Sequence, residues 1–208
     1  VKAMVDKAQV RINRRLASVV GTTATTLDGT RAPGVRTEET NLGDFLADAF
    51  LIEKAQRYDI KGRKYIGANL KYYFTDLGLR NARLNFRQQE PTHIMENIVY
   101  NELCIRGYHV DVGIVEAFGR DSSGKRLRKQ LEVDFVVNQA SQRYYIQVAY
   151  DLTSEEKQAQ EFNSLRHIPD SFKKIVIVNG IRKPWRNDEG FVIMGMKYFL
   201  LNADSLEF

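Results

Sequence analysis

The N-terminal part of the sequence alternates amphipathic stretches with a polar linker. Apolar residues recur at three- and four-residue steps through Lys2–Val20, which is the spacing of one helix face and predicts an amphipathic helix. Residues 21–34 are rich in Gly, Thr and Pro and are predicted to form a loop or linker. A second apolar stripe in Glu38–Ile52 predicts a shorter helix, which Thr40 or Asn41 would cap.

A basic β-hairpin is predicted next. Two short runs, Ala55–Ile60 and Arg63–Ile66, flank Lys61-Gly62, and a short turn with Gly between such runs is typical of a hairpin. A helix followed by a basic hairpin occurs at the end of a winged helix-turn-helix, but a hairpin that only packs against the core has the same pattern. Both alternatives stay open. In the first, Lys61, Arg63 and Lys64 would contact nucleic acid.

The rest of the chain predicts strands and helices in the order of a restriction-endonuclease-like core. The predicted strands are Tyr72–Thr75, His109–Val115, Leu131–Val137, Arg143–Tyr150, Lys174–Val178 and Phe191–Met194, and the predicted helices are Glu90–Arg106, Ser154–Leu165 and Met196–Ala203. The expected fold is therefore α/β, with a mixed sheet of the PD-(D/E)XK type flanked by helices. We expect residues 1–68 to hold the N-terminal helices, linker and wing-like hairpin, and residues 69–208 to form the nuclease-like domain.

Two neighbouring strands carry the candidate chemistry. Successive side chains of a strand point to opposite faces, so Asp134 in Leu131–Val137 and Gln147 in Arg143–Tyr150 are predicted to lie on the same side of an antiparallel hairpin. The odd-numbered residues of Leu131–Val137 are expected to share the opposite face. Glu96, on the preceding helix, is expected to face the sheet near Asp134.

The residues at these positions are an incomplete set for metal-dependent cleavage. In the nuclease core an Asp and a Glu hold a divalent metal, and a Lys two residues after the Glu orients the attacking water. Here Gln147 stands at the Glu position and Ala149 at the Lys position. A neutral amide in place of a carboxylate weakens cation binding by roughly several kcal/mol in a partly buried site. Glu96, Asp134 and Gln147 are therefore candidate degenerate catalytic residues.

Two of these residues, Asp134 and Gln147, are the candidate ligands of a weak Mg²⁺ site. Arg128 and Lys129 lie just ahead of the strand that carries Asp134, and either could take over the role of the missing Lys. They are also candidates for contact with nucleic acid.

Composition and charge narrow the classes of function. The net charge of +5 and pI of about 9.2 permit contact with nucleic acid without requiring it. Cys104, the only cysteine, is predicted to lie in the core, and one cysteine excludes a disulfide framework and a zinc–thiolate site within the chain. His93, His109 and His167 lack the spacing of metal ligands. The sequence shows neither a stretch that could cross a membrane nor a signal peptide in Val1–Arg15, so a reducing cytoplasm is the expected compartment.

Several spaced blocks of the sequence carry a family resemblance. The blocks are Asp48–Ile52, Arg57–Gly62, Lys71–Asn81, Glu96–Leu103, Gly107-Tyr108, Glu132–Val136, Tyr145–Val148 and Ala149-Tyr150. In this order they resemble the C-terminal region of prokaryotic AAA-type ATP-binding proteins. In that family a P-loop ATPase and a winged-helix segment precede a domain of unknown function with a restriction-endonuclease-like fold. The resemblance implies that Glu96, Asp134 and Gln147 occupy nuclease-like positions.

The start of the chain departs from that family. The sequence contains neither a Walker A nor a Walker B motif, and it begins with Val1. We therefore interpret it as a fragment of a longer ATPase. ATP would bind only to the missing N-terminal module, and Mg²⁺ is the one cofactor to consider in the fragment itself.

The predicted function is that of a C-terminal module of an AAA-type ATPase. We expect a non-catalytic nuclease-fold domain that binds DNA or a protein partner, the missing ATPase module being one such partner. The alternatives are an active Mg²⁺-dependent DNA nuclease and a structural oligomerisation domain. A membrane is not an expected partner, and the sequence does not give an oligomeric state.

Overall fold

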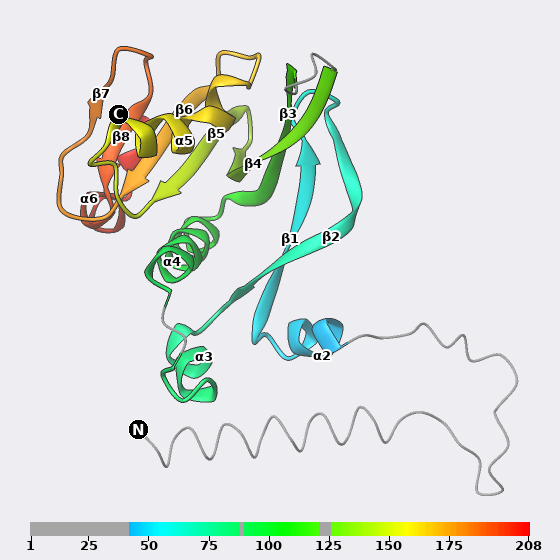
Figure 1. The fold of residues 1–208 in the computed structure, drawn as a ribbon. Helices are drawn as coiled ribbons and strands as arrows, with labels where there is room; N and C mark the ends of the chain where they lie inside the picture. Colours follow the sequence, from blue (N-terminus) through cyan, green and yellow to red (C-terminus); the bar gives the residue numbers. More distant parts are fainter. Residues whose placement is uncertain (1–41, 88–89, 121–125) are drawn as a thin grey trace, which may run out of the picture. The chain divides into compact units, whose positions relative to one another are not determined.

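The computed structural model describes residues 42–87, 90–120 and 126–208 (Figure 1). The helix predicted over Lys2–Val20, the linker after it and the start of the helix predicted over Glu38–Ile52 lie outside the described residues. The described part is a mixed α/β structure with one eight-stranded sheet in the order β2-β1-β3-β4-β5-β6-β8-β7. The predicted fold class, a mixed sheet flanked by helices, is confirmed at this level.

The elements in chain order are α2 (Leu42–Asp48), β1 (Ile52–Asp59), β2 (Lys64–Phe74), α3 (Leu77–Arg83), α4 (Pro91–Ile105), β3 (His109–Arg120), β4 (Arg126–Gln139), β5 (Gln142–Ala149), α5 (Glu155–Arg166), β6 (Lys173–Val178), β7 (Trp185-Arg186), β8 (Val192–Gly195), α6 (Met196–Leu201) and a 3-10 turn, η1 (Ser205–Glu207).

These elements divide into two compact units. The first holds the described parts of Val1–Glu53 and Phe74–Gln88, and the second holds Lys54–Tyr73 and the described residues of Gln89–Phe208. The expected division into two domains, residues 1–68 and 69–208, stays a prediction.

The first unit contains the short helices α2 and α3. The predicted helix over Glu38–Ile52 is too long at its C-terminal end, because the backbone takes a positive φ of 56° at Phe50 and Ile52 already starts β1. Helix α3 was not predicted, and Asp76 caps it by accepting a hydrogen bond from the backbone N of Leu79 at 2.9 Å.

The predicted hairpin is the edge of the large sheet. The two strands expected at Arg63–Ile66 and Tyr72–Thr75 are one continuous strand, β2, so the sequence reading divided it wrongly. β1 pairs in parallel with β3, with Tyr58 opposite Gly113. Ala55 and Ile60 of this hairpin are buried, so it packs as part of the core, and any contact with nucleic acid stays a prediction.

The second unit is built around the strands from β3 to β8. β3 pairs with β4 and β4 with β5, both antiparallel, and β5, β6 and β8 run parallel to one another. The antiparallel pairing of the predicted strands Leu131–Val137 and Arg143–Tyr150 is confirmed. β3 and β4 extend beyond their predicted ends and form a two-stranded ribbon that pairs as far as Arg120 and Arg126.

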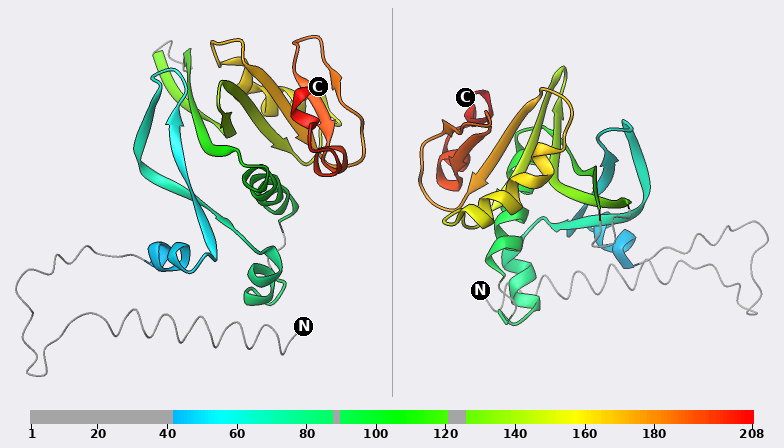
Figure 2. Two further views of the ribbon diagram at one scale, coloured as in Figure 1. Left: turned by 180° about the vertical axis from the view of Figure 1, so that it is seen from behind. Right: turned by 45° about the horizontal axis from the view of Figure 1, so that its top comes forward.

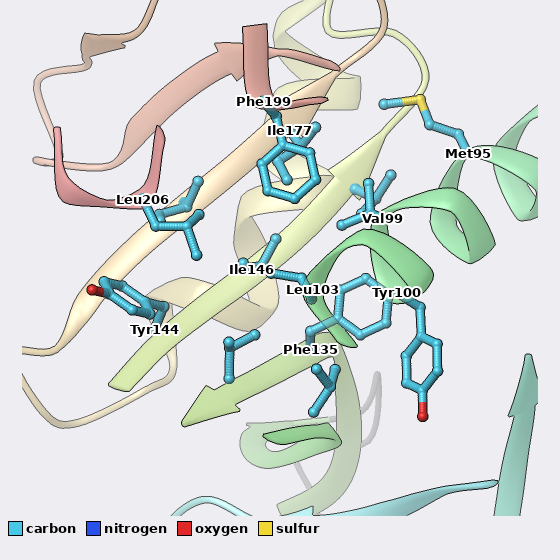
Figure 3. Close-up of a cluster of buried hydrophobic side chains, with 14 of the residues drawn as sticks. Met95, Val99, Tyr100, Leu103, Phe135, Tyr144, Ile146, Ile177, Phe199 and Leu206 are labelled. Atoms are coloured by element: carbon cyan, nitrogen blue, oxygen red, sulfur yellow. The ribbon is translucent and has the colours of Figure 1, made fainter. Parts of the chain in front are cut away.

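Two hydrophobic clusters cover the two faces of this sheet. Figure 2 shows the helices that flank the sheet from two further sides. Helix α4 and the C-terminal segment cover one face, where Leu103, Phe135 and Phe199 are fully buried (Figure 3). Helix α5 covers the other face with Phe162 and Leu165. Strand β6 contributes to both clusters, as the continuous apolar run Lys174–Val178 predicts for a strand buried on both sides.

Local signals fix the ends of α4 and α5. Pro91 occupies the first turn of α4, and Gly107, with a φ of 81°, follows its C-terminal cap. Ser154 caps α5 by accepting a hydrogen bond from the backbone N of Lys157 at 3.2 Å. Cys104, predicted to be in the core, is exposed, because the last turn of α4 buries only Leu103. Among the described residues, the helices are all too short or too polar to span a membrane.

Candidate functional site

β4 and β5 separate where the candidate catalytic residues lie. The last paired residues are Phe135 and Ile146. Beyond them, Oδ2 of Asp134 accepts a hydrogen bond from the backbone N of Val148 at 2.7 Å, and Oε1 of Gln147 lies 3.4 Å from the backbone N of Asp134. Side-chain bonds thus replace the strand ladder at this point. The structure brings Asp134 and Gln147 together, while any catalytic role for them stays a prediction.

A β-bulge in β4 shapes this region. Asp111 pairs with Val136, but Gly113 pairs with Val133. Two residues further along β3 thus correspond to three residues further along β4, so β4 carries one extra residue here. The extra residue reverses the alternation, and Val133 packs with Val136 on the opposite face of the sheet from Phe135. The prediction that the odd-numbered residues of Leu131–Val137 share one face is therefore wrong. A Cβ at Gly113 would lie 2.9 Å from side-chain atoms of both valines, so only glycine fits beside the bulge.

A lysine ammonium lies at the centre of the carboxylates. Nζ of Lys71, on β2, is 2.7 Å from Oε1 of Glu96 and 2.8 Å from Oε1 of Glu132. The guanidinium of Arg57 donates to Oε2 of Glu132 at 2.7 Å, and the hydroxyl of Tyr73 donates to Oε1 of Glu96 at 2.6 Å. Each carboxylate therefore has two donors. We call these residues, together with Asp134, the carboxylate centre.

The electrostatics of the centre favour the charged forms of Lys71 and Glu132. Burial alone would lower the pKa of Lys71, but the carboxylates of Glu96 and Glu132 outweigh it and raise that pKa. Burial alone would raise the pKa of Glu132, but hydrogen bonding and charge from Lys71 and Arg57 hold it below its ordinary value. Burial and the charge of Glu96 raise the pKa of Tyr73, so its hydroxyl stays a donor.

Asp134 has the opposite electrostatic character. Burial, followed by the negative charge of Glu96, raises its pKa well above the ordinary value for a carboxyl group. The hydrogen bond from Val148 and the charge of Lys71 act in the other direction without reversing the shift. The ionised form of Asp134 is therefore disfavoured in this environment.

Helix α5 engages the Gln147 side chain. Oε1 of Gln147 accepts a hydrogen bond from the hydroxyl of Ser164 at 3.3 Å, and the Gln147 side chain acts to lower the pKa of the neighbouring Glu161. Burial raises the pKa of Glu161 against this effect. A glutamate at position 147 would place two carboxylates close to each other, so the neutral amide suits the partly buried Glu161.

The residues at the candidate Mg²⁺ position do not fit a divalent metal. Mg²⁺ requires several oxygen ligands, preferably carboxylates, with nearly octahedral geometry. Here the amide of Gln147 is bonded to α5, ionisation of Asp134 is disfavoured, and Lys71 already neutralises Glu96. Within residues 42–87, 90–120 and 126–208, no group of three His, Cys, Asp or Glu side chains is arranged to hold a metal ion.

The basic candidates come from two segments that lie side by side. They are Lys61, Arg63 and Lys64 at the β1–β2 turn, and Arg128 and Lys129 on β4, and all five are exposed. Nζ of Lys61 lies 5.8 Å from the ring centroid of Phe118, which pairs across the ribbon with Arg128. The structure therefore places the basic turn beside the β3–β4 ribbon, although Arg128 also pairs with Glu116. Arg128 and Lys129 follow each other on β4 and so point to opposite faces of the ribbon. We call the five residues together the basic hairpin surface.

The sequence reading missed most of the carboxylate centre. Of its members, only Glu96 and Asp134 were candidates, and Arg57, Lys71, Tyr73 and Glu132 were not. Lys71 and Tyr73 are two residues apart on β2 and so share one face. That signal was available, but it requires knowing that β2 is one long strand.

Comparison with known proteins adds a family relationship. Residues 92–199, more than half of the chain, match the model of a family described as a domain of unknown function (DUF4143). An uncharacterised protein of Haemophilus influenzae is 35% identical over 152 residues, which is 73% of this chain and 34% of that protein. The chain thus spans about a third of the length of this curated relative. The family match includes Glu96, Asp134 and Gln147, and it confirms the part of the resemblance that concerns a domain of unknown function.

Proposed function

Since the chain belongs to the DUF4143 family of unknown function, we propose from the chemistry of its site that it is a non-cleaving, restriction-endonuclease-like module that binds DNA for an attached AAA-type ATPase. The observation that carries the proposal is the ammonium of Lys71, bonded to both Glu96 and Glu132. A cation that belongs to the chain therefore already pairs with Glu96, the carboxylate whose charge acts on Asp134.

Lys71 opposes metal-dependent cleavage by simple electrostatics. A divalent ion about 4 Å from an ammonium meets a repulsion of roughly 8 kcal/mol at an effective dielectric constant of about 20. Gln147 offers the ion only a neutral oxygen that is already bonded to Ser164. A hard cation therefore lacks the attraction of a full carboxylate set at Asp134 and Gln147.

The basic hairpin surface supports the assignment of DNA as the ligand. Lys61, Arg63 and Lys64 are exposed at one turn, and Arg128 and Lys129 are exposed on the adjacent ribbon. Nucleic-acid affinity comes largely from such cations, which release counterions from the phosphates. A two-stranded ribbon such as β3–β4 is also an element that fits a DNA groove.

The proposed link to an ATPase draws on the spaced blocks of resemblance and on relative length. The chain covers 34% of the Haemophilus influenzae relative, which leaves room in that protein for a further module. A DNA-binding end domain would deliver the substrate on which an ATPase works, and it needs no cleavage chemistry of its own.

DNA binding is tested by fluorescence anisotropy with a labelled duplex at two salt concentrations. We expect affinity to fall as salt rises, with a slope of about −0.9 per neutralised phosphate. The double variant Lys61→Gln/Lys64→Gln should reduce that slope by up to about 2. Lys183→Gln/Lys197→Gln removes the same charge from exposed positions outside this surface and should leave the slope unchanged. A DNA affinity that does not change with salt concentration would contradict the proposed binding surface. Equal changes of the salt slope in the two double variants would contradict it as well.

Cleavage is the alternative outcome, favoured by the position of Asp134 and Gln147 where β4 and β5 separate. Supercoiled plasmid incubated with Mg²⁺ or Mn²⁺ should stay intact with the wild-type chain. Nicking that disappears in Asp134→Ala would establish an active nuclease in place of the non-cleaving module. Nicking that persists in this variant would point to a contaminating enzyme.

A further inference from the structure

A second site lies at the carboxyl ends of the parallel strands β5 and β6. The two strands lie side by side in Figure 1 and end at Ala149 and Val178. A pocket of about 240 Å³ is lined there by residues of the segments that leave them. In open α/β sheets, the carboxyl ends of adjacent parallel strands are a preferred position for ligands. The pocket shares none of its lining residues with the carboxylate centre or the basic hairpin surface.

The pocket combines aromatic rings with a cation. Trp185 and the half-exposed Tyr150 contribute flat apolar surface, and the guanidinium of Arg182 lies 5.9 Å from the centroid of the Trp185 ring. Among the described residues, no carboxylate is within ion-pair distance of Arg182. The lining carboxylate of Asp151 is already bonded to Lys157 at 2.6 Å. The positive charge of Arg182 is therefore available to an anion.

Amide side chains complete the lining. Asn179, Asn187 and Gln158 reach the same pocket from three different segments. The Gln158 amide already donates to the carbonyl of Leu152 at 2.9 Å, and Oδ1 of Asn187 already accepts from the backbone N of Phe191 at 2.8 Å. The Gln158 oxygen and the Asn187 amide group are left for a ligand, and such groups can form hydrogen bonds with the edges of nucleobases. A planar heterocycle that carries donors and acceptors would match these groups.

The loop that carries Arg182 is held in place by the backbone. The carbonyl of Arg182 accepts a hydrogen bond from the N of Gly195 at 2.8 Å, and the carbonyl of Gly180 accepts one from the N of Lys197 at 3.0 Å. A Cβ at Gly195 would lie 2.4 Å from the backbone N of Arg182, so this close approach requires glycine. The cation is thus presented on a fixed loop, which lowers the entropic cost of binding.

We infer that this pocket binds a nucleoside monophosphate unit, with the base against Trp185 and the phosphate at Arg182. Ring stacking on an aromatic face and a charge-assisted bond to a guanidinium are the two interactions that such a ligand needs. The pocket volume of about 240 Å³ lies just below the roughly 300–1,000 Å³ of most ligand pockets, so it suits a single nucleotide unit rather than a longer segment. The inference does not depend on the basic hairpin surface. The unit can come from a free nucleotide or from the end of a single strand, and the test distinguishes the two sources.

The single tryptophan makes a direct test possible. Trp185 is the only tryptophan of the 208 residues, so a chain labelled with 5-fluorotryptophan gives one ¹⁹F resonance, which reports on this pocket. Titration of the full chain with AMP, adenosine and a 5′-phosphorylated single-stranded tetranucleotide is followed through this resonance. We expect a saturable shift with AMP and a clearly weaker response to adenosine. A response to the tetranucleotide but not to AMP would identify a strand end as the source of the same unit.

Two variants separate this site from non-specific attraction. Arg182→Gln should weaken binding about tenfold, the loss of one charge-assisted hydrogen bond. Lys183→Gln removes the neighbouring exposed charge, which does not line the pocket, and should leave the affinity unchanged. No saturable shift with any of the ligands up to millimolar concentration would overturn the inference. Equal weakening by both variants, or equal affinity for AMP and adenosine, would do the same.

Discussion

The carboxylate centre and the pocket at the carboxyl ends of β5 and β6 differ in how their charged groups are paired. In the centre, Lys71, Glu96 and Glu132 are bonded to one another, so each charge is met by another group of the chain. In the pocket, Arg182 contacts a ring but has no carboxylate within ion-pair distance among the described residues. Charges that are paired internally contribute to the free energy of folding. A charge held on a fixed loop without a counter-ion is available for a ligand.

The difference also concerns burial. The Glu96 side chain is only 10% exposed, and its charge would be costly without Lys71. Arg182 is exposed, so water solvates its charge when no ligand is bound. Substitutions in the centre should therefore change stability, whereas substitutions in the pocket should change binding and leave stability alone.

The largest effect is expected from Lys71→Met, which keeps most of the apolar stem and removes the ammonium. Glu96 and Glu132 then lose their shared cation, and we expect unfolding free energy to fall by roughly 2–4 kcal/mol. Urea denaturation at pH 7 measures this loss. The matched variant Lys197→Met, at an exposed position, should stay within about 0.5 kcal/mol of wild type. Equal losses in the two variants would show that the centre is not an ion-paired unit.

The second largest effect is expected from Asp134→Asn, which should raise the unfolding free energy. Because burial raises the pKa of Asp134 in the folded protein, its ionised form destabilises the fold at a pH above the ordinary carboxyl pKa. Asp134→Asn should therefore stabilise the chain by about 1–2 kcal/mol at pH 7, and this gain should vanish towards about pH 3. Urea midpoints at the two pH values test this, with the exposed Asp188→Asn as control. A loss of stability at pH 7 would mean that the Asp134 charge is satisfied in the folded protein.

Glu132→Gln should show the reverse pH dependence with a smaller amplitude. The folded-state pKa of Glu132 is lowered, so its stabilisation is present above the ordinary Glu pKa and is lost as the pH falls through the folded value. We expect a loss of about 1 kcal/mol at pH 7, because the Glu132 side chain is 33% exposed. Thermal unfolding of both chains from about pH 7 down to about pH 3 should show the difference shrinking below about pH 4. A difference that stays constant with pH would exclude an ion-pair origin.

The smallest effect on stability is expected in the pocket. Arg182→Gln should change unfolding free energy by less than about 0.5 kcal/mol. The same substitution at Arg106 provides the contrast, because the guanidinium of Arg106 donates to Glu102 and Ser205 and stacks on the ring of Phe199 at 4.4 Å. We expect Arg106→Gln to cost about 2 kcal/mol in the same urea experiment. If Arg182→Gln costs as much, Arg182 supports the fold and the contrast between the two regions fails.

Local sequence signals were sufficient for much of the second unit. Pro91 at the start and Gly107 after the end are the local signals for α4, and the period-two runs on either side of a polar turn predicted the β4–β5 hairpin. The edge of the sheet was harder, because β2 is half exposed and its pattern is too weak to join Arg63–Ile66 to Tyr72–Thr75. The bulge beside Gly113 was not predictable, because it depends on the register between two strands rather than on either strand alone.

The same distinction applies to the candidate site. The neighbourhood of Asp134 and Gln147 follows from one hairpin, because the antiparallel pairing of β4 and β5 ends beside both residues. The ammonium of Lys71 reaches Glu132 across 61 residues of sequence, and only the packing of β2 and β4 brings the two together. The metal-binding capacity of the site can be judged only when both the candidate carboxylates and the Lys71 ammonium are known.

The central claim, that Lys71 is the resident cation of the carboxylate centre, is tested most directly by calorimetric titration of the full chain with Mn²⁺ at neutral pH. The account predicts heats no larger than those of dilution for the wild-type chain. Saturable binding of one Mn²⁺ that is lost in both Glu96→Gln and Asp134→Asn would contradict it, because the centre would then hold a metal with Lys71 present.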